Sequence, residues 1–285
     1  MASLTPTPSS PAKPTKPKPS HPPVSVLPSQ FARVYALAHP ALLLSLVAYR
    51  FNSVVNDPVA ELLGDIPFLV GLQVVFVMGC LPPAGATTSE QKDAASSGTE
   101  SSKKVPGPRR RGHPGKGTSG SGFSTGLVLV AWKLMPALLS LTLTILLATP
   151  ILSLLLVLFG APLTTHHALT FLCGAHMALL SVFPLIYVHG VDGAVWREIW
   201  GAARPVDGLW GGSLGTALGA WFGAVPVPLD WDRPWQAYPI TILTGAYIGY
   251  CVGMLGGRVN GVFGKRIEFA PSQEEQGARV DVKVD

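Results

Sequence analysis

Charged side chains are scarce in this sequence of 285 residues. Only 13% of the residues are Asp, Glu, Lys or Arg, whereas a soluble domain usually carries about 25%. Hydrophobic residues make up 48% of the chain, and the mean hydropathy is +0.37. This shortage of charge excludes an ordinary soluble domain and indicates an all-α polytopic membrane protein.

Cysteine is also rare, with only Cys80, Cys173 and Cys251. Each lies in an apolar segment, and no two are closely spaced. The pattern therefore excludes both a disulfide framework and a cysteine metal site. We interpret the three thiols as small packing residues.

Catalytic motifs are missing. The sequence contains no HExxH, CxxC, GxSxG or P-loop pattern. His176 lies in an apolar segment, where an ionisable residue is a functional candidate by default. The interpretation we favour is a histidine that is hydrogen-bonded to a neighbouring carbonyl or hydroxyl group. We therefore predict no catalytic residues, no metal site and no cofactor.

Three segments lack the hydrophobic pattern of folded elements. Residues 1–30 contain nine prolines, three lysines and no acidic residue, which predicts an extended, disordered tail. A ligand for a proline-binding domain is the alternative. Residues 82–123 form a Gly/Ser/Pro-rich insert with seven basic and three acidic residues, which we expect to be disordered and cytosolic. Its Arg109–Arg111 run either contacts anionic lipid headgroups or is simply solvated. Residues 258–285 form a charged cytosolic tail.

The rest of the chain contains long apolar runs. About 20 apolar residues cross the hydrocarbon of a bilayer as a helix. Residues 31–81 hold two predicted spans joined by an acidic loop over 52–65, and residues 124–257 hold four more. An interfacial stretch is expected to precede the third span, ending at Trp132–Lys133, and a connector over 189–209 to lie at the interface. The first four spans are Phe31–Phe51, Ile66–Leu81, Leu134–Phe159 and about His166–Val188.

The last two spans carry glycine at every fourth position. Residues four apart lie on one face of a helix, so each segment presents a groove without side chains. In lipid, such grooves allow two helices to approach closely. The spacing predicts a terminal glycine-rich helical hairpin, whose grooves face either each other or a partner. The glycines are Gly211, Gly215, Gly219, Gly223, Gly245, Gly249, Gly253 and Gly257.

Six spans place the two tails and the basic insert on one side of the membrane. The positive-inside rule assigns that side to the cytosol, so we expect cytosolic termini. The turn between the glycine spans then faces the opposite, lumenal side.

That turn, PLDWDRPWQ at 228–236, carries the richest chemistry of the chain. Two carboxylates beside an arginine could hold a divalent ion or a phosphate-bearing headgroup. In the alternative interpretation, Arg233 pairs with Asp230 or Asp232, and the tryptophans lie at headgroup level. The candidate contact residues for a partner or a lipid are Asp230, Trp231, Asp232, Arg233 and Trp235.

Two sequence runs are similar to a known family. GAWFGAVPVPLDWDRPWQAYPI at 219–240, followed by GAYIGYCVG, and LFGAP at 158–162 resemble the Pig-F family of endoplasmic-reticulum proteins in glycosylphosphatidylinositol (GPI) anchor biosynthesis. The resemblance covers roughly residues 31–257, and the proline-rich tail and the 82–123 insert depart from it. It implies a non-catalytic membrane subunit that binds and stabilises the large catalytic phosphoethanolamine transferases of that pathway.

Two other functions stay open at this point. One is a small membrane-embedded enzyme that acts on lipid headgroups through Asp230, Asp232 and Arg233. The other is a transporter of lipids or small solutes, which the few polar groups within the spans disfavour.

Overall fold

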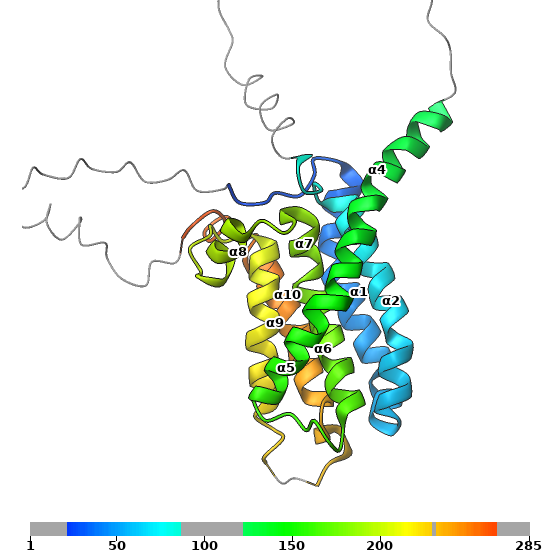
Figure 1. The fold of residues 1–285 in the computed structure, drawn as a ribbon, viewed down its shortest axis with the longest axis vertical. Coiled ribbons are helices and arrows are strands. Elements are labelled where there is room, and N and C mark those ends of the chain that lie inside the picture. The colour runs from blue at the N-terminus through cyan, green and yellow to red at the C-terminus, as the bar shows by residue number, and fades with distance from the viewer. Residues whose placement is uncertain (1–21, 87–121, 230–231, 267–285) are drawn as a thin grey trace, which may run out of the picture.

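The computed structural model describes residues 22–86, 122–229 and 232–266, with the backbone alone for 122–131. Throughout these ranges the regular elements are helices, and no strand occurs. Figure 1 shows them as one elongated bundle. Most of the predicted tails and insert, including Arg109–Arg111, lies outside the described residues, as do Asp230 and Trp231.

The first two helices are longer than predicted. Helix α1 covers Gln30–Asn56 and α2 covers Pro58–Cys80, so only Asp57 separates them. The Asp57 carboxylate accepts a hydrogen bond from the Ala60 N–H (3.2 Å), and Pro58 takes the first helical position, which suits its fixed φ. The predicted acidic loop over 52–65 is therefore wrong.

The third apolar segment is a continuous rod. Helix α4 (Gly122–Leu143) runs through a π-helical turn, Thr144–Ala148, into α5 (Thr149–Leu158). The helix passes Lys133 without a break, and the apolar span within it, Trp132–Leu158, agrees with the predicted span over 134–159, whereas the interfacial position of the preceding stretch stays a prediction. The Lys133 ammonium donates to the Met78 carbonyl on α2 (3.1 Å).

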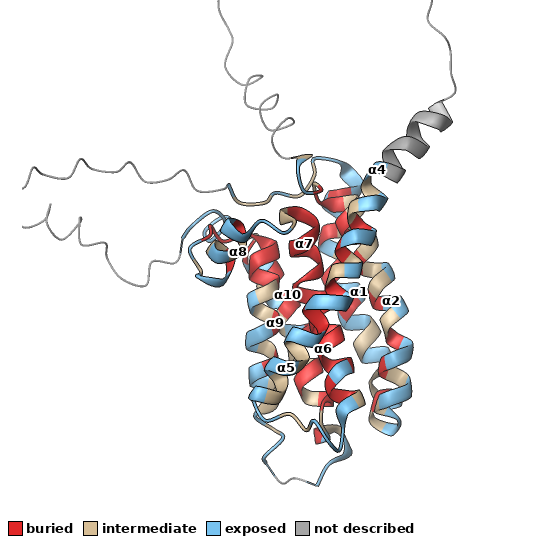
Figure 2. Cartoon of the chain, viewed as in Figure 1, coloured by how far each residue is buried: buried red, intermediate tan, exposed pale blue. Residues whose placement is uncertain are grey.

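The fourth apolar segment forms the centre of the bundle. It consists of α6 (His167–Ser181) and α7 (Phe183–His189), which together match the predicted span over 166–188. In its most apolar window 83% of the residues are buried, against 22–33% for the other three long spans. Figure 2 shows this buried centre surrounded by helices with exposed outer faces.

The remaining helices are shorter. Helix α8 covers Gly193–Trp200 in the predicted connector, and its Trp196 and Trp200 rings stack with centroids 6.5 Å apart. Helices α9 (Gly208–Ala224) and α10 (Ile240–Gly256) have 17 residues each, and a short 3-10 helix, η3 (Pro234–Gln236), lies between them.

Four helical segments in the described part of the chain are long and apolar enough to cross a membrane, and α10 is a shorter apolar helix. The structure thus supports a multi-pass membrane protein with at least these four segments in its described part, and the predicted count of six stays a prediction. Helices α9 and α10 are each about 25 Å long at 1.5 Å per residue, less than the ~30 Å hydrocarbon core of a bilayer.

The bundle has two distinct ends (Figure 1). We call one the turn end: it comprises the α1–α2 junction, the loop 159–166 and the turn 225–239. We call the other the basic end: it comprises residues 22–33, the end of α2 with Lys133 of α4 beside it, the segment 190–210 that contains α8, and residues 257–266.

Candidate partner-contact site

The glycines of α9 and α10 lie against each other's backbone. A Cβ atom added to Gly215 would overlap the carbonyl oxygen of Gly249, and one added to Gly249 would overlap that of Gly215. The same reciprocal relation holds between Gly211 and Gly253. It recurs between Gly219 and Gly245, so all three pairs exclude any side chain.

The outermost glycines continue this contact. A Cβ on Gly223 would overlap the Thr241 carbonyl oxygen, and one on Gly257 would overlap that of Asp207. Both grooves are therefore filled by the other helix. Of the two interpretations open from the sequence, this geometry favours grooves that face each other, and a partner helix must use a different surface.

One buried amide holds the turn between α9 and α10. The Gln236 side-chain nitrogen donates to the Pro226 carbonyl (3.0 Å) and to the Leu229 carbonyl (2.7 Å). Its oxygen accepts from the Arg233 N–H (3.3 Å). Gln236 was not predicted from the sequence, because a glutamine in a polar turn gives no signal of burial.

The predicted contact residues of the turn fall into two groups. Asp232, with a positive φ of 49°, and Arg233 are exposed, and Trp235 is partly buried. No ion pair joins Asp232 to Arg233 among the described residues. A pair between Arg233 and Asp230 lies outside the described residues, so the contact role of these side chains stays a prediction.

The two sequence runs that carry the family resemblance meet at the turn end. The Thr170 hydroxyl at the start of α6 donates to the Pro162 carbonyl (2.8 Å), and the Tyr238 hydroxyl donates to the Thr170 oxygen (3.0 Å). Thr170 thus joins the LFGAP loop to the turn before α10. We call the surface formed by the loop 159–166 and the turn 225–239 the tied surface, because these hydrogen bonds hold the two segments together.

A charged cluster lies beside that surface and was missed from the sequence. The Arg50 guanidinium pairs with Glu61, and its Nε lies 2.7 Å from an Asp65 carboxylate oxygen. The Asp65 side chain is 9% exposed, and the Arg50 side chain 26%. We predicted a loop here and placed Arg50 at a span end, whereas the close α1–α2 junction brings both acids to the arginine.

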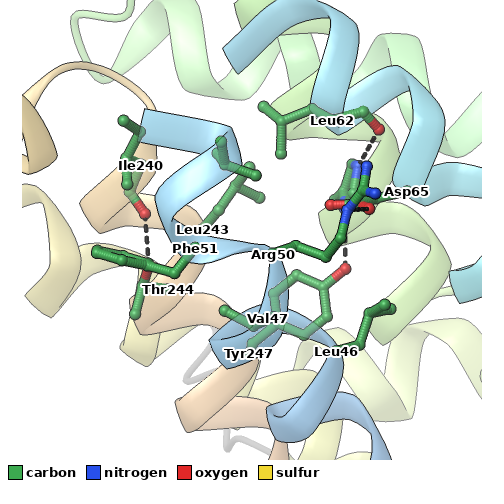
Figure 3. Close-up of a pocket in the computed structure, with 12 residues that line it drawn as sticks. Leu46, Val47, Arg50, Phe51, Leu62, Asp65, Ile240, Leu243, Thr244 and Tyr247 are labelled. Atoms are coloured by element: carbon green, nitrogen blue, oxygen red, sulfur yellow. Dashed lines mark hydrogen bonds and ion pairs between the residues drawn. The ribbon is translucent and has the colours of Figure 1, made fainter. Parts of the chain in front are cut away.

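Arg50 and Asp65 line a small pocket between α1, α2, α6 and α10 (Figure 3). Its volume is about 30 Å³, and a single water needs about 10–15 Å³. The pocket therefore admits one or two waters and no lipid headgroup.

His176 lies on the wall of this pocket with both ring nitrogens occupied. Nδ1 is 2.8 Å from the Tyr247 hydroxyl, and Nε2 is 3.0 Å from the Leu62 carbonyl. The favoured interpretation of a hydrogen-bonded structural histidine is confirmed. Its two bonds join α6 to α2 and α10.

At the basic end, Asp207 ties three segments together. One carboxylate oxygen accepts from the Leu209 and Trp210 N–H groups (3.0 and 2.8 Å), which caps α9. The other accepts from the Val24 N–H (3.0 Å). Burial raises the pKa of this carboxyl above its ordinary value, while these N–H donors and nearby Arg204 act in the opposite direction.

No group of three or more His, Cys, Asp or Glu side chains with a metal-binding arrangement occurs in the ranges 22–86, 132–229 and 232–266. Cys80, Cys173 and Cys251 are free and buried, in keeping with their interpretation as packing residues.

Comparison with known proteins extends these observations. Residues 38–258 match the model of the GPI biosynthesis protein family Pig-F. The chain is 56% identical to glycosylphosphatidylinositol anchor biosynthesis protein 11 of Aspergillus fumigatus, over 96% of this chain and 95% of that protein. It is 42% identical to the Neurospora crassa protein of that name, over 82% and 78% of the two chains.

A human relative adds a more specific description. The chain is 36% identical to the human protein named GPI ethanolamine phosphate transferase, stabilizing subunit, over 35% of this chain and 47% of that protein. No solved structure matches this chain.

Proposed function

The chain belongs to the GPI biosynthesis protein family Pig-F, and from this membership we propose that it is a non-catalytic membrane subunit that binds and stabilises a GPI phosphoethanolamine transferase. The observation that carries this proposal is its similarity to two fungal GPI anchor biosynthesis proteins and to a human stabilizing subunit of such a transferase. The large catalytic subunit is the partner, and the endoplasmic-reticulum membrane is the location.

The distribution of polar groups supports an accessory role over the enzyme alternative. Asp232 and Arg233 are exposed and are not paired with each other. The partly buried Arg50 is engaged within the fold, where its ion pairs join α1 to α2. The pocket beside Arg50 and Asp65 has room for about two waters, so it cannot enclose a lipid headgroup as a substrate site would.

The charge of the two ends supports an orientation with cytosolic termini. Seven Lys and Arg residues lie at the basic end and two at the turn end, so the basic end faces the cytosol by the positive-inside rule. The turn end, with its tied surface, then faces the lumen. The basic end has Arg33, Lys133, Arg197, Arg204, Arg258, Lys265 and Arg266 against Asp192, Glu198 and Asp207; the turn end has Arg50 and Arg233 against Asp57, Glu61, Asp65 and Asp232.

We further propose that α9 and α10 enter the bilayer as a fifth and sixth span. Each contributes 17 largely apolar residues, the lower end of the range that crosses a bilayer. Their exposed outer residues are apolar, including Leu218, Trp221 and Val252. Such surfaces suit contact with lipid or with the transmembrane helices of the transferase.

Co-purification tests the proposed function. A tagged chain is isolated from membranes in a mild detergent, and the bound proteins are identified by mass spectrometry. We expect a large GPI phosphoethanolamine transferase subunit in amounts comparable to the tagged chain. The proposal fails if the chain is recovered intact without any such subunit, or if the purified chain alone transfers phosphoethanolamine.

A further inference from the structure

A second, larger cavity lies at the basic end of the bundle. Its volume is about 300 Å³, ten times that of the pocket beside Arg50 and within the range of small-ligand sites, roughly 300–1,000 Å³. Its walls come from residues 24–26, the end of α2, the start of α9 and the segment after α10. Apolar side chains, among them Leu81, Leu209 and Phe263, make up much of the wall.

Among the described residues that line this cavity, Arg258 is the one with a charged side chain. It donates a hydrogen bond to the Ala36 carbonyl (2.6 Å), and its guanidinium carbon is 6.0 Å from the centre of the Phe76 ring. No described carboxylate lies within 4.0 Å of it. A partly buried guanidinium that meets only a neutral carbonyl and an aromatic ring keeps most of its capacity to bind an anion.

Asp207, whose negative charge acts on Arg258 through space, forms no direct ion pair with it. Asp207 is fully buried, and its two oxygens accept three backbone N–H groups from α9 and from Val24. These backbone groups hold its oxygens at the cap of α9 and at residue 24. The Arg258 guanidinium therefore has one hydrogen bond, to the Ala36 carbonyl, and keeps further N–H donors for a ligand.

The surroundings of the cavity favour an anion as well. Exposed Arg33, Lys265 and Arg266 lie at the same end of the bundle. A cluster of cations raises the local concentration of anions near the membrane surface. Ser25 and Asn260 supply a hydroxyl and an amide among the lining residues, and both groups can donate hydrogen bonds to phosphate oxygens.

We propose that this cavity binds the phosphate group of an amphiphile, namely the headgroup of a phospholipid in the leaflet at the basic end. Arg258 is the principal phosphate ligand, Ser25 and Asn260 are its hydrogen-bonding neighbours, and the apolar walls contact the glycerol and the first acyl carbons. This site lies at the opposite end of the bundle from the predicted contact residues, and it does not depend on the proposed stabilising role.

Native mass spectrometry of the purified full-length chain, with any subunits it retains, tests this site. The probes are dioctanoyl phosphatidic acid, dioctanoylglycerol as the analogue without phosphate, and inorganic phosphate. We expect one phosphatidic acid molecule per chain and no retained dioctanoylglycerol. Arg258→Gln weakens the phosphatidic acid binding at least about tenfold, because it removes charge-assisted hydrogen bonds. Arg197→Gln, at an exposed arginine of α8, retains wild-type binding.

The inorganic phosphate arm distinguishes the sources of the phosphate. If inorganic phosphate binds as tightly as phosphatidic acid, the ligand is a soluble phosphate and the lipid assignment is overturned. Equal binding of phosphatidic acid to the wild type and Arg258→Gln overturns the whole site, as does equal binding of dioctanoylglycerol. If Arg258→Gln fails to fold, Asn260→Asp replaces it: this exposed residue then places a carboxylate in the cavity, and undiminished binding contradicts the proposal.

Discussion

The close contact of α9 and α10 predicts that Gly249→Ala destabilises the protein. The added methyl group would overlap the Gly215 carbonyl oxygen and lie 2.8 Å from the Gly219 Cα atom. Both are backbone atoms, which cannot rotate away as a side chain does, so the two helices must separate. Overpacking of this kind costs about 1–3 kcal/mol. It outweighs the gain in helix propensity from replacing glycine with alanine, at most about 1 kcal/mol.

Gly71→Ala is the matched control for this prediction. Gly71 lies within α2, and a Cβ added there meets no atom within 4 Å. This change therefore keeps the propensity gain without the overlap, and we expect unaltered or slightly raised stability. At about 2–4 °C per kcal/mol for a chain of this size, Gly249→Ala has a Tm about 2–12 °C below that of Gly71→Ala, since both variants gain the same helix propensity.

Thermal unfolding of the two variants and the wild type in the same detergent measures the difference. If Gly249→Ala and Gly71→Ala unfold at the same temperature, the α9–α10 contact is looser than described here. That result refutes the conclusion that each glycine groove is filled by the other helix, and it favours grooves that face a partner.

Three further changes test other parts of the fold. Arg50→Gln leaves the Asp65 carboxylate buried without its cation and lowers the free energy of unfolding by about 2–3 kcal/mol. The control Arg33→Gln, at an exposed arginine, changes the free energy of unfolding by less than ~0.5 kcal/mol. Equal melting temperatures for the two variants contradict the ion-pair account. Asp207→Ala removes the cap of α9 and lowers the free energy of unfolding by about 1–2 kcal/mol. It also speeds amide hydrogen exchange at residue 24, because the Val24 N–H loses its acceptor. Unchanged exchange at residue 24 contradicts the anchoring role of Asp207. Gln236→Glu loses both donors to the turn carbonyls and speeds proteolysis of the turn 225–239, and unchanged cleavage contradicts the role of the amide.

The apolar helices could be predicted from the sequence, but their junctions could not be predicted with the same reliability. Hydropathy located the first four spans, whereas the acidic residues 57–65 suggested a loop. Asp57 followed by Pro58 is a helix start signal, with Glu61 in the first turn of the new helix. Capping patterns, rather than charge, contained the information about this junction.

The tertiary contacts could not be predicted from the sequence. A period of four predicts a glycine face on each helix, but the period does not identify what lies against that face. The ion pairs of Arg50 likewise depend on the short α1–α2 junction, which brings residues 11 and 15 positions apart into contact. Gln236 gave no distinct signal, because its role arises from backbone groups that the fold brings to it, and the same holds for the bond from the Val24 N–H to Asp207.

The half-life of the transferase in cells that lack this chain tests the stabilising role most directly. The chain is depleted, synthesis is stopped, and the amount of the catalytic phosphoethanolamine transferase subunit is followed over time. The account predicts that the transferase disappears several-fold faster without the chain, because an unpartnered membrane subunit is open to unfolding and degradation, and that re-expression of the wild-type chain restores it. A transferase that stays equally abundant and long-lived after depletion, while phosphoethanolamine transfer stops, would contradict the account.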